Sequence, residues 1–150
     1  MSADVVGCPA SIAPEAWQGF LALGTRRSFM RNEEIFRDRD IGSHMYVIAS
    51  GPVEILKHTT VDNDLRLAIL EDGALLGERC LFGDGRRSAT ARAYGDVEMI
   101  ALHKDDMQAY LNAHPDFALQ FYRFLCERFS QMVYDLDSDM RSLYLRLSFT

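Results

Sequence analysis

A glutamate, a glycine-containing turn and an arginine lie close together in the middle of the chain, and their side chains have the chemistry to hold a small anion. Glu78 directly follows Gly77, and Arg87 lies nine residues after Glu78. Asp84 and Gly85 favour a turn, so the two ends of this segment can return to one another. A carboxylate accepts hydrogen bonds from neighbouring hydroxyls, and a guanidinium donates two parallel bonds to a phosphate. Sugar hydroxyls on one side and a phosphate on the other describe a nucleotide.

This segment is more basic than the rest of the chain. The chain has a net charge of −6 and a pI near 5.1, which argues against extended contact with nucleic acid. Between residues 77 and 94 arginines outnumber acids, with Arg79, Arg86, Arg87 and Arg92 against Glu78 and Asp84. Backbone N–H groups near Glu78 and Ser88 can add uncharged donors. A locally basic segment in an acidic chain favours a small anion over a polymer.

The same residues resemble the phosphate-binding cassette of cyclic-nucleotide-binding domains. The likeness rests on Gly77 and Glu78, on the spacing to Arg87, and on the Arg-Ser-Ala-Thr sequence at residues 87–90. It reaches from about residue 20 to residue 146 and is closest to bacterial catabolite-activator-type (Crp/Fnr) regulators. The resemblance implies that Glu78 binds the ribose 2′-hydroxyl, that Arg87 binds the cyclic phosphate, and that Ser88 contacts that phosphate through its hydroxyl and backbone.

Two cassette residues depart from the family pattern. Arg79 stands where the family usually has an apolar residue, and Cys80 stands where it usually has alanine. A second charge beside Glu78 can weaken or redirect its bonds to the ribose. The residues expected to contact the ligand are Gly77, Glu78, Arg79, Cys80, Arg87, Ser88, Ala89, Phe129, Met132 and Val133. The plain alternative is a β-hairpin turn with a surface Glu–Arg pair.

Recognition of the base is where the resemblance is weakest. In the catabolite-activator pattern two adjacent hydroxyl residues on the long helix meet the adenine, and an ungapped alignment from Arg87 places Met132 and Val133 there. Neither side chain can make those hydrogen bonds, so we expect the purine to be held by apolar contact with Phe129 and Met132. Such contact discriminates poorly between bases. The expected effector is cyclic AMP, with cyclic GMP only modestly disfavoured.

Short apolar runs separated by turn residues predict a mainly β, α+β fold. Glycines at 42, 51 and 73 fall between runs, and residues 58–64 make a polar hairpin tip. Eight short strands at regular spacing favour a double-stranded β-helix, or jelly-roll, barrel, which is also the family's architecture. The expected strands are residues 25–30, 34–36, 45–49, 53–57, 65–70, 75–76, 89–93 and 97–102.

Helices are expected before and after the strands. Pro14 suits the first position of a short helix that Gly24 ends. A second helix spans residues 104–113 and ends before Pro115, and a long one follows from about Asp116. The long helix carries an apolar stripe, which covers a single core or also packs on a second copy. We expect a homodimer through this stripe: Phe121, Leu125, Phe129, Met132, Leu136, Met140 and Leu143.

The chain is expected to form one domain, residues 1–150. It divides into a barrel with flanking helices (about 14–115), a long helix (about 116–143) and a tail (144–150). The tail resembles the start of the family's DNA-binding half, but no room remains for a helix-turn-helix. DNA contact would therefore need a segment absent from this chain. Either the chain is a fragment of a longer regulator or it is a stand-alone sensor that acts on a protein partner.

Catalysis and metal binding find little support in the sequence. Jelly-roll cupins need clustered ligands, typically His-x-His, whereas His44, His58, His103 and His114 are isolated. The three cysteines form no C-x-x-C pair and are expected to be free thiols. No apolar run is long enough for a membrane span and no signal pattern opens the chain, so we expect a cytoplasmic location. A dimer scaffold that has lost its ligand is the remaining alternative.

Overall fold

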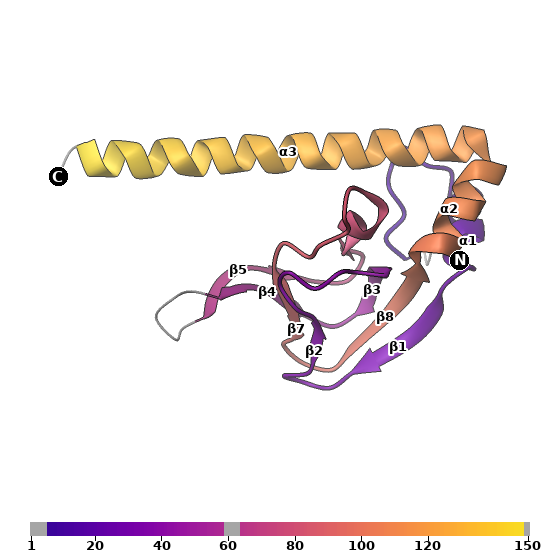
Figure 1. Ribbon diagram of the computed structural model, residues 1–150, viewed down its shortest axis with the longest axis horizontal. Coiled ribbons are helices and arrows are strands. Elements are labelled where there is room, and N and C mark those ends of the chain that lie inside the picture. The colour runs from indigo at the N-terminus through magenta and orange to yellow at the C-terminus, as the bar shows by residue number, and fades with distance from the viewer. Residues whose placement is uncertain (1–5, 59–63, 149–150) are drawn as a thin grey trace.

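The computed structural model describes the backbone of residues 6–58 and 64–148, and side chains as far as Arg141. Within these residues eight strands precede a helical pair (Figure 1). The strands are β1 (Thr25–Phe29), β2 (Glu34–Phe36), β3 (His44–Ser50), β4 (Val53–His58), β5 (Asp64–Leu70), β6 (Leu75–Leu76), β7 (Thr90–Ala93) and β8 (Val97–His103). The helices are α1 (Pro14–Leu21), the 3₁₀ helix η2 (Glu78–Leu81), α2 (Lys104–Ala113) and α3 (Pro115–Ser148).

The strands form two four-stranded sheets, ordered β1-β8-β3-β6 and β2-β7-β4-β5. Each pairing described within them is antiparallel. This arrangement confirms the mainly β, jelly-roll fold. It departs from a barrel in one respect, because the strand hydrogen bonds of the described residues make two separate sheets and not one closed ring. The tip of the predicted β4–β5 hairpin, residues 59–63, lies outside the described residues.

Two apolar clusters hold the domain together. One lies between the sheets, where Tyr46, Ile48, Val53 and Met99 are among the buried residues. The other lies where the helices cover the first sheet, and its largest fully buried side chains include Trp17, Phe20 and Phe121. Fully burying a side chain of this size stabilises a fold by about 1.5–3 kcal/mol. The helical pair is therefore packed against the first sheet through this buried cluster.

The helix α3 is much longer than the surface that it covers. Its first turns bury Phe117, Phe121 and Leu125 against α1, α2 and the sheet. From residue 130 to residue 141 every side chain is exposed, and Figure 1 shows this half of the helix extending well beyond α1 and α2. None of the described helices is both long and apolar enough to cross a membrane.

Candidate functional site

The turn after β6 places a backbone carbonyl and a carboxylate side by side. Gly77 has φ of +79°, a left-handed conformation that favours glycine, and η2 begins at the next residue, Glu78. A Cβ at residue 77 would lie 2.5 Å from Nη1 of Arg87. Glycine is thus required here twice, for the backbone conformation and for the close approach of the arginine.

Arg87 lies in a slot built by three other segments. Its side chain is buried, with 5% of the residue exposed. Nη1 donates to the carbonyl of Gly77 at 2.9 Å, and Nη2 donates to the carbonyl of His44 at 2.7 Å. The guanidinium carbon lies 4.1 Å from the centre of the Phe36 ring. Gly42 also lies against the guanidinium, since a Cβ there would overlap it.

One nitrogen of this guanidinium has no hydrogen-bond partner in the described part of the chain. Nε of Arg87 is buried and has no hydrogen-bond partner among the described residues. Burial lowers the pKa of Arg87 below its usual value, although an arginine keeps its charge at neutral pH. A buried donor without a partner costs about 1–3 kcal/mol. A buried cation with a free donor is what an anionic ligand would satisfy.

The backbone on either side of this arginine is fixed by the segment before β3. The N–H of Arg87 donates to the carbonyl of Asp40 at 2.8 Å, and the carbonyl of Arg87 accepts from the N–H of Arg39 at 2.9 Å. Nζ of Lys57 donates to the carbonyl of Ser88 at 3.0 Å and pairs with Asp38 at 2.9 Å. The cassette is therefore held by its main chain, which leaves the side chain of Ser88 exposed.

Glu78 is buried and forms an ion pair that the sequence did not lead us to expect. Nε of Arg128, on α3, lies 3.0 Å from Oε1 of Glu78. Nη2 of the same arginine donates to the carbonyl of Leu75 at 2.6 Å. Arg128 thus joins the long helix to both sides of the Gly77 turn. Because the second bond goes to a carbonyl, the carboxylate retains acceptor capacity for a further donor.

The structure places the side chain of Arg87 against the turn that carries Glu78. Arg87 bonds to the carbonyl of Gly77, the residue immediately before Glu78. Arg79 is exposed and donates through Nε to the carbonyl of Arg86 at 3.1 Å, and no ion pair between Arg79 and Glu78 is found among the described residues. Its charge is thus directed to a backbone carbonyl. Ala89 is buried.

Cys80 belongs to the apolar core beneath the cassette, where burial raises the pKa of its thiol to about 11. Cys126, on α3, is exposed. Since the thiolate is the reactive form, we expect iodoacetamide at pH 8 to label Cys126 in the folded protein and to leave Cys80 unlabelled. Peptide mass spectrometry after a timed reaction measures both sites at once. Full labelling of Cys80 in the folded protein would contradict its placement in the core.

The predicted base-contact residues lie on the part of α3 that leaves the domain. Phe129 is half-buried, and its ring centre lies 6.0 Å from that of Phe82 in the cassette loop. Met132 and Val133 are exposed, at 52% and 67%. Of the residues predicted at a dimer interface, Phe121 and Leu125 lie in the domain's own core and are not accessible to a second copy. The side chain of Leu143 lies outside the described residues.

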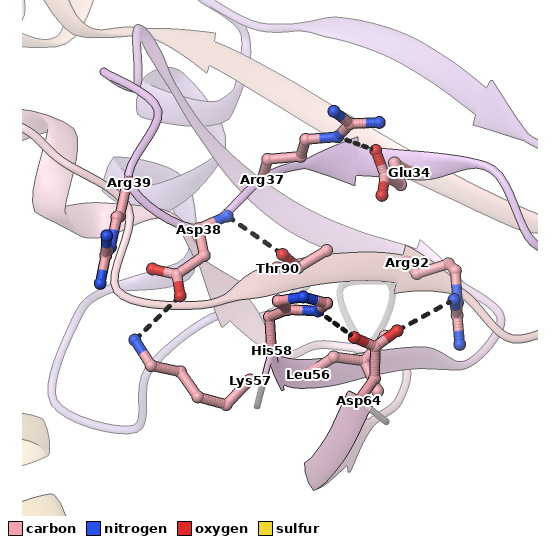
Figure 2. Close-up of a pocket in the computed structure, with 10 residues that line it drawn as sticks. All are labelled: Glu34, Arg37, Asp38, Arg39, Leu56, Lys57, His58, Asp64, Thr90 and Arg92. Carbon is pink, nitrogen blue, oxygen red and sulfur yellow. Dashed lines mark hydrogen bonds and ion pairs between the residues drawn. The ribbon is translucent and has the colours of Figure 1, made fainter. Parts of the chain in front are cut away.

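A cavity of about 710 Å³ opens on the side of the second sheet near β2, β4 and β7 (Figure 2). Its basic side chains largely lie against carboxylates: Lys57 against Asp38, and both His58 and Arg92 against Asp64. Thr90 of the cavity wall accepts a hydrogen bond from the N–H of Asp38. Such mutual pairing is typical of a solvated ionic network, and this wall serves to fix the segment that holds Arg87.

Possible metal ligands do not gather in the described part of the chain. No group of three histidine, cysteine, aspartate or glutamate side chains there is placed to hold a metal ion. His44 and His103 lie opposite each other on neighbouring strands, with ring centres 5.0 Å apart. Nε2 of His44, however, lies 3.2 Å from a guanidinium nitrogen of Arg27. Burial and the neighbouring cations lower the pKa of His44.

A jelly roll that carries a glycine–glutamate turn, a buried arginine and a long covering helix is the arrangement that the comparisons with known proteins also identify. The family model of the cyclic nucleotide-binding domain matches residues 26–114. The chain belongs to the cyclic nucleotide-binding domain family, and its similarities place it with the Crp/Fnr-type regulators.

Three relatives illustrate this membership. The chain is 32% identical to the Cyclic AMP receptor protein of Thermus thermophilus over 126 residues, which is 84% of this chain and 58% of that protein. The crystal structure of the Thermus thermophilus Catabolite Activator Protein matches with a TM-score of 0.73 and 32% identity, covering 85% of this chain and 60% of that one.

The N-terminal domain of a transcriptional regulator from Streptomyces coelicolor A3(2) matches with a TM-score of 0.75 and 27% identity. That match covers 86% of this chain and 92% of the other. The chain therefore spans less than two thirds of the Thermus relatives, but most of a structure that comprises the N-terminal domain of a regulator alone.

Proposed function

We propose that this chain is the cyclic-nucleotide-sensing domain of a Crp/Fnr-type transcription regulator, and that its effector is cyclic AMP. The observation that carries the proposal is the buried guanidinium of Arg87 with its unpartnered Nε. A cyclic phosphate carries one negative charge and two exocyclic oxygens, which match a cation that still has a donor to give. The proposed function is binding and signalling, with no catalysis by the domain.

Glu78 would take the sugar. Its carboxylate lies at the start of η2, one residue from the carbonyl that holds Arg87. A carboxylate has room for more than one donor, so a ribose 2′-hydroxyl can bind while Arg128 remains in place. Because Arg128 belongs to α3, occupancy of this site would bear directly on the position of the long helix.

The long helix would carry the signal. Phe82, in the cassette loop, has its ring centre 6.0 Å from that of Phe129 and 6.3 Å from that of Tyr122, both on α3. Ligand binding that shifts the cassette would therefore shift α3, and with it the partner helix of a homodimer. Output to DNA would act through a helix-turn-helix joined to this domain, and a protein partner is the alternative output.

Calorimetry with cyclic AMP and cyclic GMP side by side tests the effector and its specificity. Met132 and Val133 offer no hydrogen bond to a base edge. We therefore expect cyclic AMP to bind. Cyclic GMP should bind too, with an affinity lower by less than about 100-fold, which corresponds to about 2.7 kcal/mol of binding free energy. The double variant Met132→Thr with Val133→Ser should increase the preference for adenine. Leu119→Thr, on an exposed position of α3, is the matched control.

The outcomes separate the possible functions. Much stronger discrimination in the parent chain would mean that another residue reads the base. Binding of neither nucleotide would favour a dimer scaffold without a ligand. The internal partners of Glu78 and Arg87, which are Arg128 and the two carbonyls, are compatible with that alternative.

A further inference from the structure

The ring of Phe36 is the surface against which the phosphate-binding guanidinium lies. The guanidinium carbon of Arg87 is 4.1 Å from the ring centre. Phe36 ends β2 and pairs with Ala91 on β7, so its backbone is fixed by the sheet. Behind it the ring stacks on buried Tyr46, with centres 6.1 Å apart and planes inclined by 27°. The arginine thus rests on an aromatic pair that is itself held by two sheets.

This support matters because the hydrogen bonds of Arg87 leave its orientation incompletely fixed. The two carbonyl acceptors engage Nη1 and Nη2. Nε has no partner in the described protein, so nothing polar holds that edge of the fork. A cation over an aromatic face is attracted by the ring, more strongly where water is excluded. Contact with the ring therefore limits the tilt of the guanidinium plane.

We propose that Phe36 is a positioning residue for the anion clamp, and that its ring sets which exocyclic oxygen of a bound cyclic phosphate Arg87 contacts. This inference rests on the proposed function, because it needs a cyclic nucleotide in the site. The ring touches the arginine and acts through it. An aliphatic residue of similar bulk keeps the packing and loses the attraction of the π face.

A fixed guanidinium should distinguish the two exocyclic oxygens of the phosphate. The two phosphorothioate diastereomers of cyclic AMP each replace one of these oxygens with sulfur, which is a weaker hydrogen-bond acceptor. The parent protein should bind one diastereomer about 10-fold more weakly than the other, the effect expected for one weakened charge-assisted bond. A guanidinium that samples several tilts would contact either oxygen, and the two diastereomers would then bind with more similar affinities.

The experiment compares Phe36→Leu and Phe36→Tyr with the parent, by calorimetry with cyclic AMP and with both diastereomers. Phe29→Leu is the matched control, because Phe29 is also partly buried against the inter-sheet core and makes no contact with Arg87 among those described. Phe36→Leu should weaken cyclic AMP binding about 10-fold. It should also reduce the ratio between the dissociation constants of the two diastereomers to about 3-fold or less. Phe36→Tyr keeps an aromatic ring and should have the parent's cyclic AMP affinity and the parent's ratio. Phe29→Leu should change neither value. Thermal unfolding of each variant reports its fold.

Three results would overturn the inference while the parent protein still binds cyclic AMP. One is an unchanged ratio in Phe36→Leu, whatever its affinity, since a packing role weakens both diastereomers equally. Another is an equal decrease of the ratio in Phe29→Leu, and the third is a ratio in Phe36→Tyr that is as low as in Phe36→Leu. If the parent protein binds no cyclic nucleotide, the proposed function fails first, and Phe36 loses the role with it.

Discussion

Replacing Arg87 with leucine is expected to remove most of the affinity for cyclic AMP, at a cost of about 2–5 kcal/mol. The cost is high because the guanidinium is buried, so that water screens its charge only weakly. Calorimetry of the variant beside the parent measures it. Removing one charge from a desolvated pair leaves the other charge without its partner, and that penalty makes up much of the loss.

The same substitution should leave the fold in place. Leucine removes a buried cation whose Nε has no partner, which is a gain. It also leaves the carbonyls of Gly77 and His44 without these donors, which is a loss of similar size. Thermal unfolding should therefore change little.

Arg86→Leu is the matched control for this experiment. Arg86 is the preceding residue in the chain and is also an arginine, but it is exposed and pairs with Asp84. The control should bind cyclic AMP nearly as well as the parent, since an exposed pair contributes little. If Arg87→Leu binds with unchanged affinity in a folded protein, Arg87 is not the phosphate clamp and the assignment of the cassette is wrong.

Much of the fold could be read from the sequence because its signals are local. The eight predicted strands all occur, and the second helix begins and ends where predicted, since Pro115 ends it. The turn at Gly51 shows why such glycines are informative. It has a positive φ of 99°, and a Cβ there would overlap the carbonyl of Asp96. A steric requirement of this kind can be recognised from a single residue of the sequence.

The contacts between distant segments could not be read in the same way. The pair between Glu78 and Arg128 joins residues 50 positions apart, on a turn and on a helix. The apolar stripe of the long helix carries no information about the partners of its polar residues. A usable signal did exist, because a glutamate expected in a buried cassette needs a cation, and Arg128 lies one residue before Phe129 of the stripe. The contact of Phe36 with Arg87 left no signal in spacing at all.

The apolar stripe of α3 was predicted to pack partly on its own domain and partly on a second copy, but Phe121 and Leu125 were assigned to the dimer interface and are buried in the domain. Phe121 and Leu125 face the domain's own core. Beyond Phe129 the apolar residues have no cover within the described chain, and Leu136 is 63% exposed. Helical periodicity reports that a face is apolar and not what covers it. The helix has a covered part and an uncovered part because of its length. Its 34 residues span about 51 Å, which is longer than the surface of the domain that it covers.

The uncovered half of α3 has the spacing of a two-stranded coiled coil. Phe129, Val133, Leu136 and Met140 follow one another at intervals of four, three and four residues, which is the heptad pattern. We infer a parallel homodimer in which this seam meets its copy. Sedimentation equilibrium of the parent chain should therefore show a dimer at micromolar concentration. A short bis-maleimide linker should join the two copies through Cys126, which is exposed in the single chain.

Leu136→Glu is expected to separate this dimer, because each copy would bury an unpaired carboxylate in the centre of the seam. Its dissociation constant should rise by at least about 100-fold, or 2.7 kcal/mol, while α1, α2 and the sheets keep their thermal transition. Ser138→Glu adds the same charge to the same helix two residues away, where the heptad faces outward, and should remain a dimer. Crosslinking at Cys126 should persist in Ser138→Glu and disappear in Leu136→Glu. A parent chain that is monomeric at high micromolar concentration would refute the coiled coil, and so would an Leu136→Glu variant that remains dimeric.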